Sequence, residues 1–506
     1  MSRRIGFRWI ALAAALAATP PAVRASDPGP IVVRVYHTND VHGWIMSRPD
    51  RLRANRRLGG AAALKALLDK DAGAKLVLDA GDWWQGTPEG SLSKGEAVAE
   101  IFNAIGYDAV EVGNHEFDSG ADGLKALIGK MAMPVLAANV YDADGKHVPW
   151  ARQRIVKEVA GVKFGIFGLL TSRMRTLEVP DKIAGLRFRR EVDEARDQVA
   201  ALKREGADVI IAVTHVGFEE IDKPPFEGDQ TIAREVAGID LIVGGHTHTT
   251  LSRAWRDPAH GTLIVQAGSY LTKVGRATLK IDSHRVVSSS DELLDLWPDR
   301  VGENSAMKAI VARREMDVGE TFNVVVATAT ADMNRGVGDQ ESGLGSWMAD
   351  CFKDWGGADA AVVNGGGIRA DIPAGPVTVR RLFEVMPFDD SIVKLRMRGD
   401  LLRSALDHVV GSPKIAQIGG MTAELRPLRF RQRRLAAVTV GGAPLDDAKT
   451  YSVATLDFVA GSYEEFARAE SLQRTGTLAR DALRACAEKQ KTIAPPAPGR
   501  LKSSEE

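Results

Sequence analysis

Short runs of aliphatic and β-branched residues, each ending abruptly in a polar cluster, recur through the first half of the chain. The runs lie at residues 31–36, 75–78, 109–112, 209–213 and 241–243. Helical patterns at 60–70 and 96–105 stand between some of them. Continuous apolar runs of this length are typical of buried strands, and the helices between them indicate crossover connections. We therefore predict α/β structure, in which ligands bind at the carboxyl ends of the strands.

The character of the chain changes after residue 282. A serine run at 288–290 and a charged helical stretch at 302–315 indicate a linker. A second region of α/β pattern follows, with buried runs at 324–327, 360–363 and 392–396. The last residues, rich in Pro, Gly, Lys and Ser, are typical of a disordered tail.

A chain of 506 residues is too long for one ordinary core and suits two large domains. We expect a signal peptide at 1–25, a first domain at 26–285, a linker at 286–320, a second domain at 321–493 and a disordered tail at 494–506.

The N-terminus has the three parts of a secretory signal peptide. Basic residues up to Arg4 precede an apolar stretch at 9–18, and Val23-Arg-Ala25 offers a small-x-small cleavage site. The apolar stretch is too short to span a membrane, and no later segment is apolar enough. We expect a periplasmic or secreted protein without a membrane span, exported by the Sec route, with twin-arginine export as the alternative that the pair Arg3-Arg4 offers.

Charge and cysteine content exclude several classes. Lys and Arg together number 66, as do Asp and Glu, so the chain has no excess of positive charge that would indicate binding to nucleic acid or anionic lipid. The two cysteines, Cys351 and Cys486, show no Cys-x-x-Cys spacing, which excludes zinc fingers and iron–sulfur sites. They could form one disulfide in an exported protein. The sequence leaves that pairing open, together with the oligomeric state.

Polar clusters follow each apolar run of the first region and contain residues that bind metals. A single Asp or His after a strand is usually a cap or a turn residue. Here, however, a large share of the 10 histidines lies just past such runs, with carboxylates, an asparagine and close-approach glycines beside them. The joint pattern predicts a metal site, and its candidate ligands are Asp40, His42, Asp82, Asn114, His215, His246 and His248.

Oxygen and nitrogen ligands without thiolates suit Zn, Mn, Co or Fe at a catalytic site. The candidate ligands are too many for one ion, so two divalent ions are expected, with a carboxylate bridging them. Two such ions can bind a phosphoryl group, ionise a water and stabilise an in-line displacement. The residues alone therefore predict a phosphohydrolase.

The same clusters resemble, in order and in detail, the signature blocks of the calcineurin-like metallophosphatases. The blocks are Asp40-x-His42, Gly81-Asp82, Gly113-Asn-His-Glu116, His215 and Gly245-His-Thr-His248. The stretches His37-Thr-Asn-Asp-Val-His-Gly43, Asn364-Gly-Gly-Gly-Ile-Arg369 and Met386-Pro-Phe388 are similar to the 5'-nucleotidase and UDP-sugar hydrolase branch. The resemblance covers nearly the whole chain after the signal peptide. It implies a four-layer αββα domain followed by a smaller α/β substrate-binding domain.

The resemblance also implies roles for the residues at the metal site. Asp40, His42, Asp82 and His248 would hold one ion, while Asp82, Asn114, His215 and His246 would hold the other. His115 and Asp118 resemble the family's catalytic dyad, in which the histidine stabilises developing charge and the aspartate orients its ring. A metal-bound water would be the nucleophile. His37 is expected in the core, or in support of a ligand, rather than as a ligand itself.

The second domain would recognise the substrate. Asn364 and Arg369 resemble the contacts to ribose or phosphate, and Phe388 and Phe458 the two rings that enclose a nucleobase. Two departures are visible. The stretch after Phe458 lacks the family's Gly-Gly-Asp, with Glu464 at the Asp position. The helix after residue 345 carries no arginine where relatives often have one.

The predicted function is hydrolysis of nucleoside 5'-monophosphates. One alternative is the same chemistry on a UDP-sugar, a 2',3'-cyclic nucleotide or a sulfur-bound group. Another is an inactive nucleotide-binding protein, which would lack ligands or the dyad; all are present here.

Overall fold

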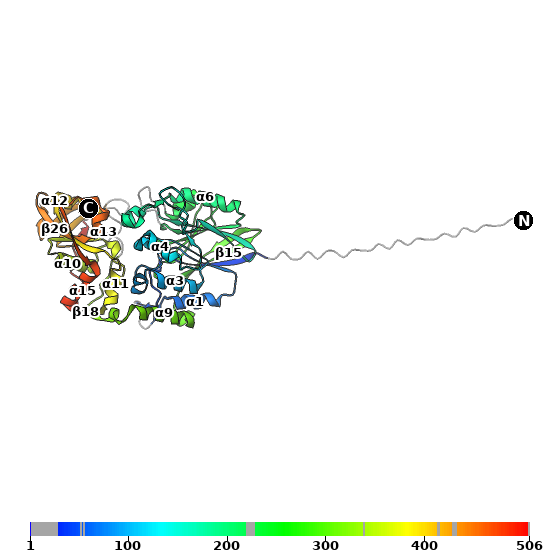
Figure 1. Ribbon diagram of the computed structural model, residues 1–506, viewed down its shortest axis with the longest axis horizontal. Helices are drawn as coiled ribbons and strands as arrows, with labels where there is room; N and C mark the ends of the chain where they lie inside the picture. Colours follow the sequence, from blue (N-terminus) through cyan, green and yellow to red (C-terminus); the bar gives the residue numbers. More distant parts are fainter. Residues whose placement is uncertain are drawn as a thin grey trace.

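The computed structural model describes Met1 and residues 29–50, 53, 56–218, 228–336, 340–411, 415–427 and 433–503. The predicted signal peptide lies outside the described residues, apart from Met1. Figure 1 shows two domains side by side, the first in blue to green and the second in yellow to red. No helix in the described ranges combines the length and apolar character needed to cross a membrane.

The first domain contains two large sheets. The first sheet has the order β16-β15-β1-β4-β5-β6, with β17 also paired to β15. Its strands are β1 (Ile31–Thr38), β4 (Lys75–Asp79), β5 (Ala109–Glu111), β6 (Val135–Leu136), β15 (Lys273–Asp282), β16 (Arg285–Ser290) and β17 (Leu293–Asp295). The strands β1, β4, β5 and β6 are mutually parallel, so their carboxyl ends meet at one edge.

The second sheet has the order β13-β14-β12-β11-β9-β8. Its strands are β8 (Arg154–Val159), β9 (Val162–Leu170), β11 (Val209–His215), β12 (Leu241–Gly244), β13 (Trp255–Arg256) and β14 (Leu263–Val265). The central strands β9, β11, β12 and β14 are parallel. This sheet therefore also presents the ends of its central strands on one side.

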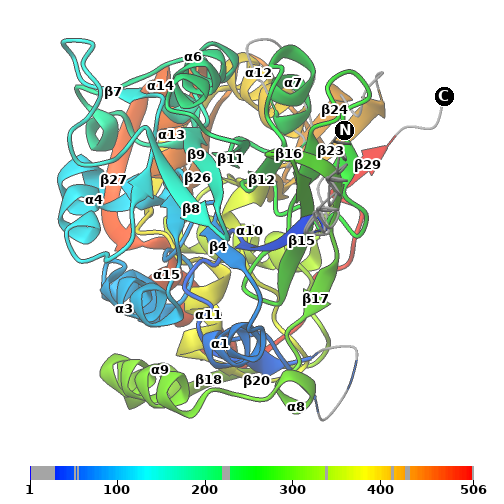
Figure 2. The same ribbon diagram turned by 90° about the vertical axis from the view of Figure 1, so that its right-hand side faces the viewer.

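The two sheets pack face to face, and helices cover their outer faces. Val35 and Leu78 of the first sheet share one buried cluster with Ile166 and Val213 of the second. Alternate residues such as Tyr36 face outward, toward α1 (Ala61–Lys70), α3 (Glu96–Ile105) and α4 (Gly120–Ile128). The outer face of the second sheet packs on α6 (Glu191–Arg204) and α7 (Asp229–Glu235), far from α1 and α3 in Figure 2. The expected four-layer αββα arrangement is confirmed.

The serine run at 288–290 is not part of a linker. It ends β16, which pairs antiparallel with β15, so Ser290 lies opposite Thr278. The prediction failed because an edge strand with one face in solvent tolerates serine, and the sequence shows no sign of its pairing partner. The connection is instead dominated by α9 (Ser305–Val318), which packs along α1 and α3 and joins Glu100 through Arg313 and Arg314.

The second domain is a smaller α/β unit. Its main sheet has the order β22-β19-β26-β21-β27. The strands are β19 (Ala360–Val363), β21 (Ser391–Arg398), β22 (Gln417–Gly419), β26 (Thr450–Leu456) and β27 (Ser471–Leu478). The helices α10 (Gly343–Gly356), α12 (Gly399–Val410) and α15 (Ala479–Gln490) pack on this sheet in one continuous core. A small sheet begins with β18 (Val325–Ala329), near the expected run at 324–327.

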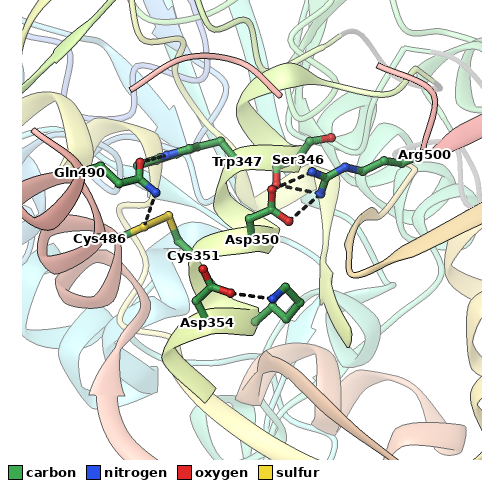
Figure 3. The surroundings of a disulfide bond; sticks show 9 residues. Ser346, Trp347, Asp350, Cys351, Asp354, Cys486, Gln490 and Arg500 are labelled. Atoms are coloured by element: carbon green, nitrogen blue, oxygen red, sulfur yellow. Dashed lines mark hydrogen bonds and ion pairs between the residues drawn. A yellow bond between two sulfur atoms is a disulfide. The ribbon is translucent and has the colours of Figure 1, made fainter. Parts of the chain in front are cut away.

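Cys351 on α10 and Cys486 on α15 form a disulfide, with their Cα atoms 5.8 Å apart (Figure 3). The bond joins residues 135 positions apart, which explains why the sequence could not decide the pairing. The two helices also meet through a hydrogen bond from Trp347 to Gln490, drawn beside the disulfide in Figure 3.

The predicted disordered tail at 494–506 is wrong for residues 494–503. Strand β29 (Leu501–Ser503) pairs parallel with β23 (Met421–Pro427). Arg500 donates two hydrogen bonds to Asp350, at 2.8 and 2.7 Å (Figure 3). Composition indicated disorder, but these partners lie far away in sequence and hold the segment in place.

Candidate metal centre

All seven predicted metal ligands meet where the two sheets present the carboxyl ends of their strands. Asp40 and His42 follow β1, Asp82 follows β4 and Asn114 follows β5. His215 ends β11, and the segment containing His246 and His248 follows β12. The site lies between the two sheets, which is why residues from five separate segments can converge.

Four of these residues form a compact group. One ligand atom each from Asp40, His42, Asp82 and His248 all lie within 4.8 Å of one another. The Nε2 atoms of His42 and His248 are 3.1 Å apart, and His248 Nε2 lies 3.1 Å from Asp40 Oδ1. Such a convergence of imidazole nitrogens and carboxylate oxygens in a buried place fits a metal ion.

Asp82 connects this group to the remaining ligands. Its Oδ2 lies 3.6 Å from His42 Nε2 and 3.2 Å from His215 Nε2. His246 Nδ1 lies 3.0 Å from Asn114 Oδ1, and the His246 ring lies 5.1 Å from the His215 ring. The second set of predicted ligands is therefore adjacent to the first, with Asp82 between them.

Backbone carbonyls orient two histidines as metal ligands. Nδ1 of His42 lies 2.7 Å from the carbonyl oxygen of Gln85, and Nδ1 of His215 lies 2.6 Å from that of Ala80. Burial lowers the pKa of His215, but the charge of Asp82 outweighs it and raises the pKa to about 10, so a metal ion there would displace the proton on Nε2. Since a carbonyl only accepts, each Nδ1 keeps its proton, which leaves Nε2 as the metal-binding atom. This tautomer is the one that a metal ion requires.

One oxygen of the Asp40 carboxylate accepts hydrogen bonds, and the other accepts none from the described residues. Its Oδ2 accepts from the Asn39 side chain at 2.6 Å and from the His246 backbone N–H at 3.0 Å. Its Oδ1 is buried, accepts no hydrogen bond from any described residue and lies 3.1 Å from His248 Nε2. A buried carboxylate oxygen without a hydrogen-bond donor, beside imidazole nitrogens, fits a divalent cation.

Backbone strain is concentrated at the same residues. Positive φ angles between 50° and 75° occur at five predicted ligands: Asp40, His42, Asp82, His246 and His248. Residues with a Cβ seldom adopt this left-handed region, and such strain collects at functional sites. Glycine is needed beside them, because a Cβ on Gly113 would collide with Asp82 and one on Gly245 would approach the Ala80 carbonyl at 2.6 Å.

The charges of the site influence one another strongly. Burial, followed by the charge of Arg369, holds the pKa of His42 well below its usual range. Burial favours protonation of Asp82, but His215 and His115 outweigh it and hold the pKa of Asp82 well below its usual range. Asp82 is therefore ionised and His42 neutral, the states in which both act as ligands.

The predicted dyad is assembled beside the ligands. His115 Nδ1 lies 3.2 Å from both carboxylate oxygens of Asp118, and the His115 backbone N–H donates to Asp82 Oδ1 at 3.0 Å. Burial lowers the pKa of His115, but Asp118 and Asp82 outweigh it and raise the pKa above the usual value. The dyad can therefore present a protonated imidazole to an anion at the site.

Glu116 ties two ligand loops together, a role that its place in the sequence motif did not reveal. It is fully buried. Its Oε1 accepts from Trp83 N at 2.7 Å, and its Oε2 accepts from Asp82 N at 2.9 Å and Gly113 N at 2.7 Å. One carboxylate thus fixes the loop after β4 against the loop after β5.

The second domain reaches the same centre. Arg369 Nη2 lies 2.9 Å from His42 Nε2 and 3.5 Å from His248 Nε2. The ring of Phe388 lies 5.4 Å from that of His115, and the Arg369 guanidinium lies 6.0 Å from the Phe388 ring. Arg369 and Phe388 are therefore placed to contact a molecule bound at the metals.

The other predicted substrate residues differ in burial and in their contacts. Asn364, after β19, keeps a buried Oδ1 without a hydrogen-bond partner among the described residues. Phe458, in α13 (Asp457–Ser462), is half-buried against the core of the second domain. Glu464 begins α14 (Glu464–Ala467) and is exposed. In the described part of the chain, no ring contact links Phe458 to Phe388 or His115.

Sequence reasoning missed three further residues that lie at or near the border of the centre. Tyr270 packs edge-on against His42 and His248, with ring centroids 5.7 and 5.4 Å apart. Arg48 donates to the Tyr270 carbonyl at 3.3 Å, and Arg335 of the second domain lies 3.4 Å from the Tyr270 hydroxyl. Their sequence surroundings carry no motif, so only the contacts around Tyr270 in the folded protein identify them.

His37 is confirmed as a core residue rather than a ligand. Its Nε2 lies 3.2 Å from Asp291 Oδ1, with both side chains buried. Gly275 on the paired strand β15 leaves the space for this ring, because a Cβ there would overlap it.

This fold and site define a calcineurin-like metallophosphatase. Residues 33–250 match the calcineurin-like phosphoesterase family, and residues 324–470 match the 5'-nucleotidase C-terminal domain. The chain therefore belongs to the 5'-nucleotidase family and is a metal-dependent phosphoric ester hydrolase.

Individual relatives agree with this assignment. The chain is 29% identical to snake venom 5'-nucleotidase of Gloydius brevicauda, over 90% of this chain and 84% of that protein. It is 28% identical to Protein UshA of Yersinia enterocolitica, over 91% of each. The crystal structure of a 5'-nucleotidase precursor from Thermus thermophilus superposes with a TM-score of 0.86 at 27% identity, covering 94% of this chain and 100% of that one.

Proposed function

We propose that this protein is an exported hydrolase that releases phosphate from nucleoside 5'-monophosphates with two divalent metal ions. The position of Asp82 carries the proposal: its Oδ2 stands between His42 and His215, 3.6 and 3.2 Å from their Nε2 atoms. A carboxylate in that place can serve two ligand sets at once.

The ligands divide into two sets around Asp82. Asp40, His42, Asp82 and His248 would hold one ion, and Asp82, Asn114, His215 and His246 the other. When bound, such a pair supplies an activated water and neutralises charge on the phosphoryl group. The nitrogen and oxygen donors suit Zn, Mn, Co or Fe.

The remaining groups bind and orient the substrate. His115 would donate a hydrogen bond to the phosphoryl or leaving oxygen, with Asp118 holding its ring. Arg369 would bind the phosphate with its planar guanidinium. Phe388 and Phe458 would enclose the base, with Asn364 on the ribose and Glu464 near the base.

A second candidate substrate is a nucleotide with a further phosphate, such as a UDP-sugar. The guanidinium groups of Arg48 and Arg335 donate to carbonyl and hydroxyl oxygens beside the metal centre and form no ion pair with a described residue, while Arg48 also stacks on the ring of Trp44. Their positive charges would attract a second phosphate group. The altered stretch after Phe458 also favours a substrate other than a simple monophosphate.

The test is phosphate release by purified protein that has been stripped of metal and reloaded with Mn, Co or Zn. The substrates are AMP, UMP, UDP-glucose, 2',3'-cyclic AMP and an aryl phosphate diester. Metal-dependent release that is strongest from AMP or UMP supports the proposal. Strong cleavage of UDP-glucose with weak monophosphate turnover supports the second candidate, and inactivity with every metal refutes both.

Export is supported by the disulfide between Cys351 and Cys486, because such bonds form in oxidising compartments and are rare in the cytosol. Fractionation of cells that express the full chain tests it. Recovery of the protein in the cytosolic fraction, with both thiols reduced, would contradict export.

A further inference from the structure

Tyr270 stands where the two domains meet at the metal centre. It lies in the first domain, between β14 and β15, and is half-buried. Its backbone N–H donates to the carbonyl oxygen of Asp40 at 2.8 Å, so it is joined to the loop that carries the first two predicted ligands. Tyr270 and Leu271 both have positive φ angles, of 62° and 50°. Two successive residues with a Cβ in this region make a strained backbone, and such strain collects at functional sites.

The ring of Tyr270 packs against two predicted ligands. Its centroid lies 5.7 Å from that of His42 and 5.4 Å from that of His248, and both contacts are edge-on. The ring of Trp44 lies 5.5 Å from the tyrosine ring, and the guanidinium group of Arg48 lies 5.5 Å from its centroid. A tyrosine side chain has only two rotatable bonds. A ring that is packed in this way therefore holds its hydroxyl group in a fixed place.

The hydroxyl group of Tyr270 reaches the second domain. It donates a hydrogen bond to the carbonyl oxygen of Arg369 at 3.1 Å. Arg335 Nη1 donates to the same carbonyl oxygen at 2.9 Å, and the backbone N–H of Arg369 donates to the carbonyl of Val385 at 2.9 Å. The backbone of Arg369 is therefore held by two residues of its own domain and by Tyr270 of the first domain.

The guanidinium group of Arg369 points at the same ligands against which the tyrosine packs. Its Nη2 lies 2.9 Å from His42 Nε2 and 3.5 Å from His248 Nε2. Tyr270 thus contacts the ligands with its ring and the backbone of the arginine with its hydroxyl group. Since an arginine binds phosphate as a planar fork, a shift of about 1 Å in its backbone would misplace both N–H groups.

We propose that Tyr270 is a positioning residue: its hydroxyl group fixes the backbone of Arg369 relative to the metal ligands, and so holds the guanidinium group where it binds the phosphate of the substrate. No bond is made or broken at Tyr270. Its effect passes entirely through Arg369. The inference rests on the proposed function for the role of Arg369 in binding phosphate.

The substitution Tyr270→Phe removes the hydroxyl group and keeps the ring. One lost hydrogen bond corresponds to about 3- to 10-fold in binding. We expect KM for AMP to rise by that factor while kcat stays within about twofold, because the arginine binds the phosphate before and during the reaction. Tyr141→Phe is the matched control, since it also loses one hydroxyl donor, from a bond to Glu194 at 2.8 Å.

A double-mutant cycle with Arg369→Ala separates positioning from a general effect on the fold. Because the hydroxyl group acts through the arginine, Tyr270→Phe should lower kcat/KM about 3- to 10-fold in the wild type. The same substitution should have less than about a twofold effect when Arg369 is already alanine. An equal factor in both backgrounds, or a KM of Tyr270→Phe that matches the Tyr141→Phe control, overturns the proposal.

Calorimetric titration with inorganic phosphate gives a readout that needs no turnover. Protein reloaded with Mn should bind phosphate about 3- to 10-fold more weakly in Tyr270→Phe than in the wild type or in Tyr141→Phe. Equal dissociation constants in the three proteins overturn the proposal. A wild type that hydrolyses no substrate of the panel but shows this difference in phosphate binding would contradict the proposed function and still support the role of Tyr270.

Discussion

The substitution Glu116→Gln tests whether one buried carboxylate organises the metal centre. In the wild type its two oxygens accept three backbone N–H groups, from Asp82, Trp83 and Gly113. Glutamine has a single acceptor oxygen. Whichever way the amide turns, at least one N–H loses its acceptor and faces an NH₂ group. The loop after β4 should then separate from the loop after β5.

The expected loss follows from the number of bonds. Burial, and then the charge of Asp82, raises the pKa of Glu116 to about 8, so its bonds near pH 7 are those of a neutral acid. Leaving one buried N–H without an acceptor costs about 1–3 kcal/mol of combined loop order and metal binding. Residues that support metal ligands typically change metal affinity by about 10- to 100-fold. We expect Glu116→Gln to weaken binding of Mn or Zn within that range.

Chelator competition gives the metal dissociation constants, and thermal unfolding of metal-free protein gives the effect on the fold. Glu111→Gln is the matched control, since Glu111 is equally buried near the same loop and its carboxyl group accepts no hydrogen bond from a second loop. Burial raises the pKa of Glu111 well above its usual range, so a neutral amide replaces a neutral acid there. Metal binding by Glu116→Gln as tight as in the Glu111→Gln control would refute the reasoning.

Three further predictions concern stability. Arg380→Met leaves the fully buried carboxylate of Glu89 without its cation, which lies 2.6 Å away in the wild type. This should cost about 3–5 kcal/mol in the free energy of unfolding, measured by denaturant titration. A double variant with Glu89→Gln that is no more stable than Arg380→Met alone would contradict this. Reducing the disulfide between Cys351 and Cys486 should lower the free energy of unfolding by about 2–5 kcal/mol. Reductant should therefore lower the Tm of the wild type but not that of a variant with both cysteines changed to alanine. Burial raises the pKa of Asp229 to about 8, so the folded state keeps a proton that the unfolded chain releases, and stability falls as pH rises from about 4 to 8. Asp229→Asn should remove about 4 kcal/mol of that cost at pH 7, and equal pH dependence of unfolding in both proteins would exclude it.

Much of the candidate site could be predicted because its ligands obey local rules. A buried strand is a short apolar run, and the residues just beyond its carboxyl end lie at the edge of the sheet. Asp40, His42 and His215 stand in such positions, so the sequence identifies them without any knowledge of contacts between their segments. The strands follow from periodicity, whereas the four-layer arrangement is implied by the family resemblance.

Local rules do not reveal contacts between distant segments. The three N–H donors around Glu116 come from two loops, and the ion pair between Arg380 and Glu89 joins residues 291 positions apart. Nothing near Arg48 or Arg335 in the sequence indicates that both border one tyrosine.

The sequence by itself determined the class of chemistry, because the types of metal ligand and their positions after strands are visible in short segments of sequence. The tertiary structure alone decided which side chains support those ligands. It also decided that Cys351 pairs with Cys486 and that residues 494–503 are ordered. The physical reason is that hydrogen bonds, ion pairs and disulfides act over a few ångströms in space, whatever the separation along the chain.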